Sequence, residues 1–77
     1  LALADLWERV HQKTGVTREE ICGPSRMRRI SAARAMLCAL ARREGIMAVD
    51  VAEQLGRSRS AVVHLAKKID RMENDRV

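Results

Sequence analysis

The side chains of this chain best suited to specific chemistry are its arginines and lysines, which are concentrated in two acid-free segments. Residues 21–43 contain six arginines and no acidic residue, and residues 57–69 contain two arginines and two lysines, again with no acidic residue. A guanidinium group forms paired hydrogen bonds with phosphate and with guanine better than an ammonium group does. The two segments therefore indicate a surface that binds a polyanion.

The charge balance and the length of the chain exclude several other functions. The 77 residues include fifteen Lys and Arg against ten Asp and Glu, which gives a net charge of +5 and a pI near 10.2. A chain this short buries only about 60% of its unfolded surface, which leaves no room for a catalytic layer beside a deep cleft. The sequence offers no paired carboxylates and no nucleophile with a base, so we expect no enzymatic activity, cofactor, metal or small-molecule substrate.

The two cysteines, Cys22 and Cys38, are sixteen positions apart, and His11 and His64 are not at the spacing of a zinc site with them. We interpret both thiols as reduced, small apolar side chains of an intracellular, cytoplasmic protein. No apolar run approaches the roughly 18 residues of a membrane helix, and no secretory signal is visible. Because the sequence begins with leucine rather than methionine, we expect residues 1–77 to be a single domain of a longer protein.

Composition and helical periodicity predict an all-α domain. Apolar residues make up 47% of the chain and are almost all aliphatic, with one tryptophan and no tyrosine or phenylalanine. The pair Thr17 and Glu20 fits a capping box at the start of a short helix, and glycines mark the ends of other helices. The sequence predicts five helices, at about residues 2–14, 18–22, 32–44, 48–55 and 59–74.

A basic segment precedes the third predicted helix. Residues 25–29, Ser-Arg-Met-Arg-Arg, have no amphipathic period and are predicted to form a loop, with residues 30–31 as the staple and N-cap of the helix that follows. Arg34 then lies near the exposed beginning of that helix. Arg26 or Arg28 could enter an A·T-rich minor groove, where the negative potential is deepest. Contacts to phosphates alone are the alternative for four arginines, Arg28, Arg29, Arg42 and Arg43.

The last two predicted helices fit a helix-turn-helix motif. Ala52 is small enough to let the two helices approach closely, and Gly56 permits a sharp turn between them. Val62 and Leu65 then anchor the second helix. The alternative is an ordinary helical hairpin in which Gly56 only ends a helix, but the acid-free run on the second helix favours DNA binding.

In this arrangement the face of the last helix opposite its apolar stripe would enter the major groove of duplex DNA. Arg59 could form two parallel hydrogen bonds with guanine, Ser60 could reach a base edge or a phosphate, and Val63 could contact a thymine methyl group. A lone histidine is more often a surface residue than a base reader. The residues assigned to DNA binding are Arg26, Arg28, Arg29, Arg34, Arg57, Ser58, Arg59, Ser60, Val63, His64 and Lys67.

The predicted elements follow a recognisable order: a short helix pair, a basic loop, a helix with an arginine near its start, and a terminal helix-turn-helix. The last of these contains Gly-Arg at 56–57, Val-Val-His at 62–64 and Lys-Lys-Ile at 67–69. Over about residues 5–69 the chain resembles domain IV, the DNA-binding domain of the bacterial replication initiator DnaA. The resemblance implies that Arg26 enters the minor groove, that Arg34 reads the major groove, and that the protein is nucleoid-associated.

The chain departs from DnaA at the centre of this motif, where residues 58–61 read Ser-Arg-Ser-Ala in place of Asp-His-Thr-Thr. Residues 24–29, 33–38 and 58–62 are more similar to the DnaA-like C-terminal domains of REP-associated tyrosine transposases. That pattern has a serine where this chain has Met47, which predicts a weakly capped fourth helix. The two resemblances imply origin binding or recognition of transposon ends, without the ATPase or nuclease of the parent proteins.

Two functions of other classes stay open. The stripe of Val62, Leu65, Ile69 and Met72 could pair with a partner helix, which would make the chain a protein-interaction module. The basic surface could instead attach to acidic lipid, as the resemblance to the initiator implies. Sequence-specific binding of double-stranded DNA is the function we predict.

Overall fold

The computed structural model describes residues 3–25 and 27–75, with side chains as far as residue 69. Within these residues all the regular secondary structure is helical, which confirms the predicted all-α fold. In this described part of the chain no helix has the length and apolar character needed to cross a membrane. The helices are α1 (Leu3–Thr14), α2 (Arg18–Cys22), α3 (Arg28–Arg43), α4 (Ala48–Leu55) and α5 (Arg59–Asp75).

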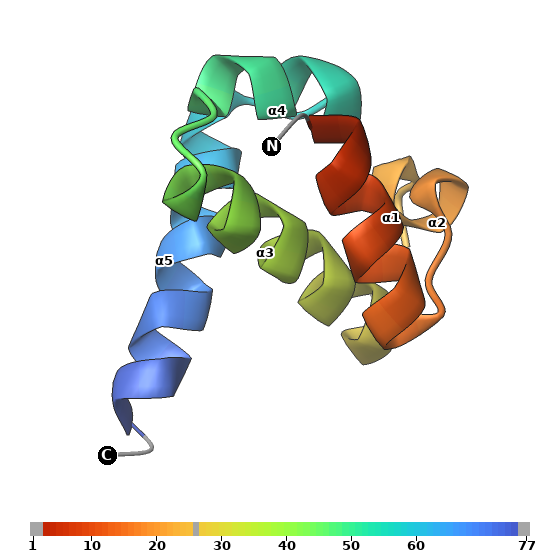
Figure 1. Cartoon of the computed structure of the whole chain (residues 1–77), viewed down its shortest axis with the longest axis horizontal. Helices are drawn as coiled ribbons and strands as arrows, with labels where there is room; N and C mark the ends of the chain where they lie inside the picture. The colour runs from red at the N-terminus through yellow and green to blue at the C-terminus, as the bar shows by residue number, and fades with distance from the viewer. Residues whose placement is uncertain (1–2, 26, 76–77) are drawn as a thin grey trace.

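α3 is the central helix, and the other helices pack around it (Figure 1). α1 and α2 lie on one side of α3, α5 lies on the other side, and α4 crosses one end. The most extensive helix interface is the one between α3 and α5. Four alanines of α3 are buried, and their small side chains let neighbouring helices come close on both sides. They are Ala33, Ala35, Ala39 and Ala41.

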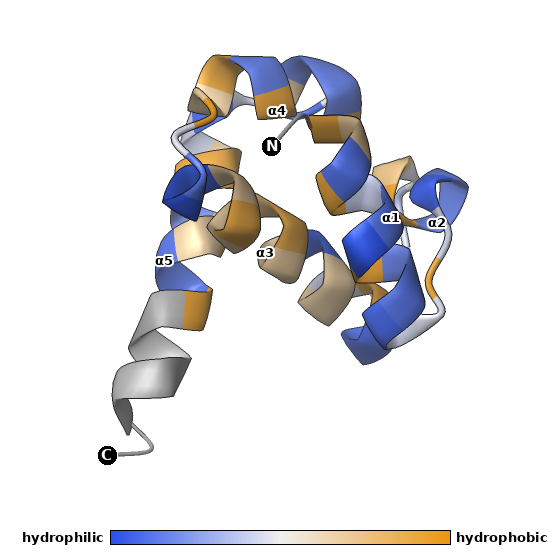
Figure 2. Cartoon of the chain, in the orientation of Figure 1, coloured by the Kyte–Doolittle hydropathy of each residue, from blue (hydrophilic) through white to orange (hydrophobic). Residues whose placement is uncertain are grey.

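The core is aliphatic, as the composition predicts, and every helix contributes to it. Leu6, Ile21 and Leu37 come from the first three helices and are at most 1% exposed. Leu55 of α4 is equally buried, and Val62 of α5 is 3% exposed. Figure 2 shows the apolar segments along α3 and α4 in orange. The side of α5 that carries Val62 is therefore covered by the chain's own core.

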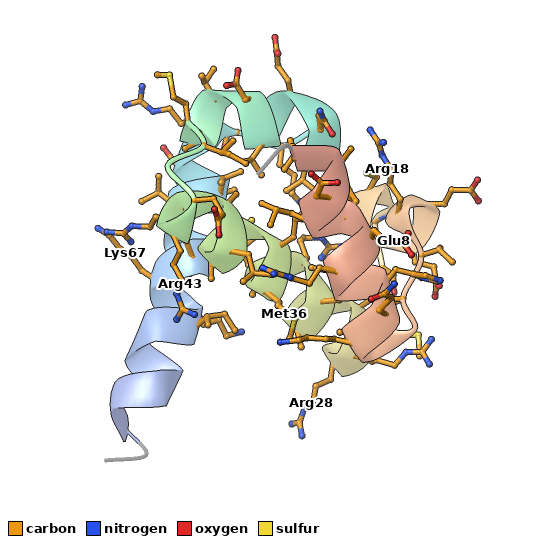
Figure 3. All side chains as sticks on the ribbon, viewed as in Figure 1. Glu8, Arg18, Arg28, Met36, Arg43 and Lys67 are labelled. Carbon is orange, nitrogen blue, oxygen red and sulfur yellow. The ribbon has the colours of Figure 1, made fainter. Side chains whose placement is uncertain are left out.

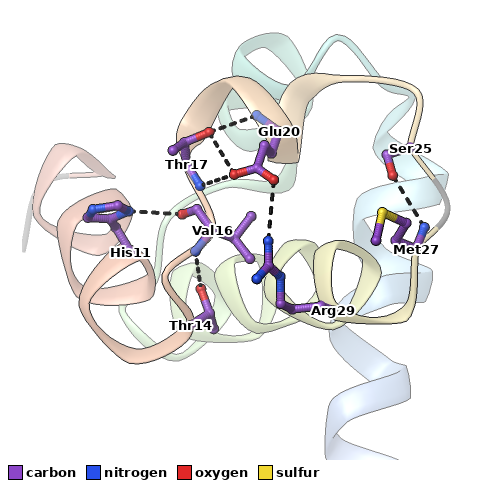
Figure 4. Close-up of polar contacts among 8 residues, drawn as sticks. All are labelled: His11, Thr14, Val16, Thr17, Glu20, Ser25, Met27 and Arg29. Carbon is purple, nitrogen blue, oxygen red and sulfur yellow. Dashed lines mark hydrogen bonds and ion pairs between the residues drawn. The ribbon is translucent and has the colours of Figure 1, made fainter.

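The connection between α1 and α2 contains the predicted capping box (Figure 4). The backbone N–H of Glu20 donates to Thr17 Oγ1 at 3.2 Å, and the backbone N–H of Thr17 donates to Glu20 Oε1 at 3.1 Å. The hydrogen bonds from the backbone and hydroxyl of Thr17, with a smaller effect of the Arg29 charge, hold the pKa of Glu20 below its usual value. The box satisfies N–H groups that the first turn of a helix leaves unpaired.

The start of α3 differs from the prediction. Arg28 and Arg29 belong to the first helical turn rather than to a loop, and Met27 is the N-cap, without a side-chain capping bond. Ser31 lies inside the helix, where its N–H donates to the Met27 carbonyl at 2.8 Å. The predicted cap at Ser31 is wrong because Ile30, only 4% exposed, is held in the core and extends the helix toward the N-terminus.

A polar cluster joins α1, α2 and α4 around the side chain of Gln54. Trp7 Nε1 donates to Gln54 Oε1 at 2.8 Å, and Arg18 Nη2 donates to the same oxygen at 3.2 Å. The Arg18 guanidinium also lies 4.9 Å from the centre of the Trp7 ring, within the range of a cation–π interaction. Cys22 Sγ donates to the Gln54 carbonyl at 3.3 Å. These contacts fix the C-terminal end of α4 against the first two helices.

We predict that Gly56→Ala destabilises the domain by about 1–2 kcal/mol, the usual cost of the left-handed conformation for an L-residue. Gly56 has φ of 67°, and a Cβ built there has no atom within 4 Å, so the cost comes from backbone strain and not from a clash. Denaturant unfolding measures the change. Gly56→Asn is the matched control and should cost less, because asparagine tolerates this conformation. Equal losses for the two variants would contradict the explanation.

We predict that the stabilising effect of the Glu20 charge disappears in acid. Its pKa is lower in the folded chain than the ordinary 4.5, so the unfolded chain binds more protons and the effect is complete only above that value. Thermal unfolding of the wild-type chain and of Glu20→Gln, from about pH 7 to pH 3, measures it. The advantage of the wild type should shrink as the pH falls below 4.5. An advantage independent of pH would show that the charge contributes nothing.

Candidate nucleic-acid interface

α4, the turn after it and α5 form the predicted helix-turn-helix. The N–H of Gly56 bonds the carbonyls of Ala52 and Glu53, and the glycine takes the left-handed conformation expected of it. The Arg57 N–H also donates to the Ala52 carbonyl at 3.1 Å, so the chain turns sharply between the helices. α4 has the predicted bounds, and its N-cap Met47 makes no side-chain capping bond, as expected.

The inner side of α5 packs on the core of the domain. Val62 is buried, Leu65 is partly buried against the core, and Ala52 of α4 is 6% exposed beneath them. Ala66, 1% exposed, belongs to the same buried side, although its size hid it from the predicted stripe. Val62 and Leu65 are thus already used within the chain, which argues against their pairing with a partner helix; the side chain of Met72 lies outside the described residues.

The outer side of α5 carries most of the predicted reading residues. Arg59, Ser60, His64 and Lys67 are exposed, and Ser60, His64 and Lys67 follow one another at intervals of one helical turn. Val63 differs, because it is half-buried and lines a cavity between α3, α4 and α5. The polar part of the predicted reading face is therefore presented together, whereas Val63 lies at its edge.

Ser58 has a structural part in this face. Its Oγ accepts a hydrogen bond from the Ala61 N–H at 3.2 Å, and its carbonyl accepts one from the Val62 N–H at 3.2 Å. Ser58 is thus the predicted N-cap of α5. It is exposed, so the cap stands at the end of the helix that would face a nucleic acid.

The arginines of α3 lie at both ends of the helix. Arg28 and Arg29 are exposed in its first turn, where Arg29 Nη2 is 3.6 Å from Glu20 Oε2 in a surface ion pair. Arg42 and Arg43 are in its last turn. Figure 3 shows Arg43 on the same side of the molecule as Lys67, with Arg28 at the far end of α3. Positive charge therefore lies beside α5 at the C-terminal end of α3, and a second group of positive charges lies at its N-terminal end.

The structure contradicts the prediction that Arg34 is exposed. Arg34 is only 5% exposed and donates from Nε to the Ile21 carbonyl at 2.8 Å. Its Nη2 donates to the carbonyls of Gly23 at 3.1 Å and Ser25 at 3.3 Å. Desolvation, together with the nearby Arg57 charge, lowers the pKa of Arg34. A side chain held in this way is not available to a base edge, so its assignment as a major-groove reader is corrected.

Arg57 shares an acceptor with Arg34. Its Nη2 donates to the Gly23 carbonyl at 3.1 Å, and its side chain is half-buried. Arg57 therefore connects the turn of the helix-turn-helix with the segment between α2 and α3. Arg26, the predicted minor-groove residue, lies outside the described residues.

Sequence reasoning missed the structural role of Arg34, although a signal for it was present. Ile30, Arg34, Leu37 and Ala41 are spaced by four, three and four positions, which places the arginine on the same stripe as three buried apolar residues. The positive charge of Arg34 predicts an exposed side chain, whereas its spacing indicates a buried one. Periodicity was the better guide at this position.

The cavity beside α5 has a volume of about 380 Å³ and is lined mainly by aliphatic side chains, with Arg42 and Lys67 also contributing. Cys38 lines it as well, and burial raises the pKa of its thiol to about 11, so the thiol stays protonated at neutral pH. Neither cysteine is in a disulfide. Among the described residues no cluster of histidine, cysteine or carboxylate side chains is suited to a metal.

A sharply turned helix pair whose second helix presents arginine, serine, histidine and lysine to solvent defines a helix-turn-helix domain of the DNA-binding class. Comparison with protein families agrees with this class. The model of the bacterial DnaA protein helix-turn-helix matches residues 3–69, and the chain belongs to that family. DNA binding is the function that membership implies. Comparison with curated proteins and with solved structures gave no match.

We predict that Ser58→Ala lowers the stability of the domain by about 1 kcal/mol, because an N-cap acceptor is lost. Ser58→Asp keeps an acceptor at this position, so its unfolding free energy should stay close to that of the wild type. The added negative charge should nevertheless weaken DNA binding. Chemical denaturation and a DNA titration of both variants test the two effects separately. A Ser58→Asp variant that binds DNA as well as the wild type would remove Ser58 from the interface.

Proposed function

We propose that this domain recognises a specific sequence in duplex DNA by placing the outer side of α5 in the major groove. The observation that supports this most is the exposure of Arg59, Ser60, His64 and Lys67 on one helix that directly follows the turn. Arg59 can form two parallel hydrogen bonds with guanine, and Ser60 and His64 can bond base edges or phosphates. Lys67 is suited to a phosphate.

The arginines of α3 extend the interface along the DNA backbone. α3 has 16 residues and a length of about 24 Å, so cations at its two ends can reach phosphates about seven base-pair steps apart. Arg28 and Arg29 serve one end of this span, and Arg42 and Arg43 serve the other. Arg26, next to Arg28 in sequence, is the candidate for an adjacent minor groove. A duplex target also places the protein at the nucleoid.

The biological target is either a replication origin or the end of a mobile element. The segments that resemble transposase-associated domains, around Arg26 and Arg59, favour the second. Selection of bound duplexes from a random pool distinguishes them. Recovery of DnaA boxes would support origin binding, and recovery of inverted or hairpin-forming repeats would support recognition of transposon ends.

We predict that Arg59→Ala weakens binding to the selected duplex by about 1–3 kcal/mol and relaxes sequence preference, because a bidentate base contact is lost. Arg42→Ala should weaken specific and random duplexes alike and reduce the slope of log affinity against log salt by about 1, because one phosphate contact is lost. Fluorescence anisotropy at several salt concentrations measures both effects.

Arg9→Ala is the matched control, because it removes an exposed arginine from α1, on the other side of α3 from α5. Its binding and salt slope should stay close to those of the wild type. Equal losses of affinity for all three variants would show that binding depends only on net charge. A complex whose affinity does not change with salt would contradict DNA binding by this surface.

The two alternative functions, protein interaction and lipid binding, predict different results for the same protein. A protein-interaction module would give a stable dimer that Leu65→Lys converts to a folded monomer, as light scattering would show. A lipid-binding surface would be displaced from DNA by acidic vesicles in a sedimentation assay.

A further inference from the structure

We propose that Arg34 and Arg57 are positioning residues that fix residues 23–25 of the α2–α3 connection against the helix-turn-helix. The inference rests on the proposed DNA interface, because it explains how two separate parts of that interface keep their relative positions. The geometry behind it is the shared carbonyl of Gly23, which accepts from Arg34 Nη2 and from Arg57 Nη2, each at 3.1 Å.

Arg34 holds the connection from inside the domain. Its three hydrogen bonds go to the carbonyls of Ile21, Gly23 and Ser25, so they span the end of α2 and the residue immediately before Arg26. Arg34 belongs to α3 and is buried on the stripe that packs into the core. The path of the connection is therefore determined by a helix that cannot move without disrupting the core.

Ser25 is bound from two directions. Its carbonyl accepts from Arg34 Nη2 at 3.3 Å, and its Oγ accepts from the Met27 N–H at 3.3 Å (Figure 4). The second bond satisfies an N–H at the N-cap of α3, which has no side-chain cap of its own. Ser25 is thereby bonded both to α3, through Arg34, and to the N-cap residue of α3, Met27.

Arg57 holds the same connection from the opposite side. It lies in the turn between α4 and α5, immediately before the N-cap Ser58, and reaches Gly23 across 34 positions of sequence. A carbonyl oxygen has two lone pairs, so it can accept from both guanidinium groups. The turn before α5 and the buried side of α3 are thereby connected through the carbonyl of Gly23.

The acceptors of these hydrogen bonds indicate that Arg34 and Arg57 position the connection. Both guanidinium groups bond neutral carbonyl oxygens, and the two positive charges lie close enough for Arg57 to lower the pKa of Arg34. Repulsion between two nearby positive charges lowers the stability of the fold. The planar guanidinium of arginine can bond several carbonyls at once, in a geometry that a lysine ammonium cannot reproduce. Precise placement of the connection is what this arrangement provides.

The test uses Arg34→Lys and Arg57→Lys, which keep the charge and remove the planar guanidinium, with Arg9→Lys on the exposed side of α1 as the matched control. We expect each of the first two to weaken specific binding about tenfold or more, the equivalent of about 1.4 kcal/mol, with an unchanged salt slope. Because they share one carbonyl, their combined loss should be less than the sum of the two. Arg9→Lys should retain binding.

Amide hydrogen exchange of the DNA-free protein is the second readout, and it does not depend on the proposed function. The Met27 N–H should exchange faster in Arg34→Lys and in Arg57→Lys, while amides in α1 keep their protection. Arg57 is only half-buried, so its variant provides the test if Arg34→Lys does not fold.

Unchanged exchange at Met27 in a folded variant, or a lysine variant that binds DNA as the wild type does, would overturn the positioning role. A loss of one unit of salt slope would instead make the arginine a phosphate contact. If the wild-type domain does not bind duplex DNA at all, the proposed function fails, whereas the exchange result still decides whether the two arginines hold the connection.

Discussion

The burial of α3 between two layers of helices is the constraint on which the rest of the domain depends. α1 and α2 need one side of this helix, and α5 needs the other. Alanines make the double packing possible because they bring helix axes close without filling the space with side chains. Position 34 lies on the buried side of this helix, and the arginine there bonds backbone carbonyls of the segment that follows α2.

Those parts of the structure that depend on local chemistry could be predicted from the sequence. The capping box of Thr17 and Glu20 and the left-handed glycine at position 56 are properties of a few adjacent residues, and they were found in the structure where the pattern placed them. The bounds of α4 follow from the same kind of signal. Cationic residues on the outer side of α5 were predictable because one helix determines which residues share a face.

What could not be predicted depends on contacts between distant segments. Charge suggested that Arg34 is exposed, but three carbonyls of another segment satisfy it within the fold. The arginines in the first turn of α3 break the amphipathic pattern and predict a loop, but the burial of Ile30 extends the helix over them. The bond from Trp7 to Gln54 spans 47 positions and has no local signature. In each case tertiary structure overrode a preference that was correct as an average.

The placement of the single tryptophan has a practical consequence. Trp7 is 7% exposed and lies on α1, beside Arg18 of α2 and Gln54 of α4, on the other side of α3 from α5. Its indole emission is sensitive to the docking of these three helices, and it is remote from the helix that would meet a base pair. Unlabelled protein therefore offers an intrinsic optical signal for unfolding that a bound oligonucleotide does not quench by direct stacking, so folding and association can be followed independently in one cuvette.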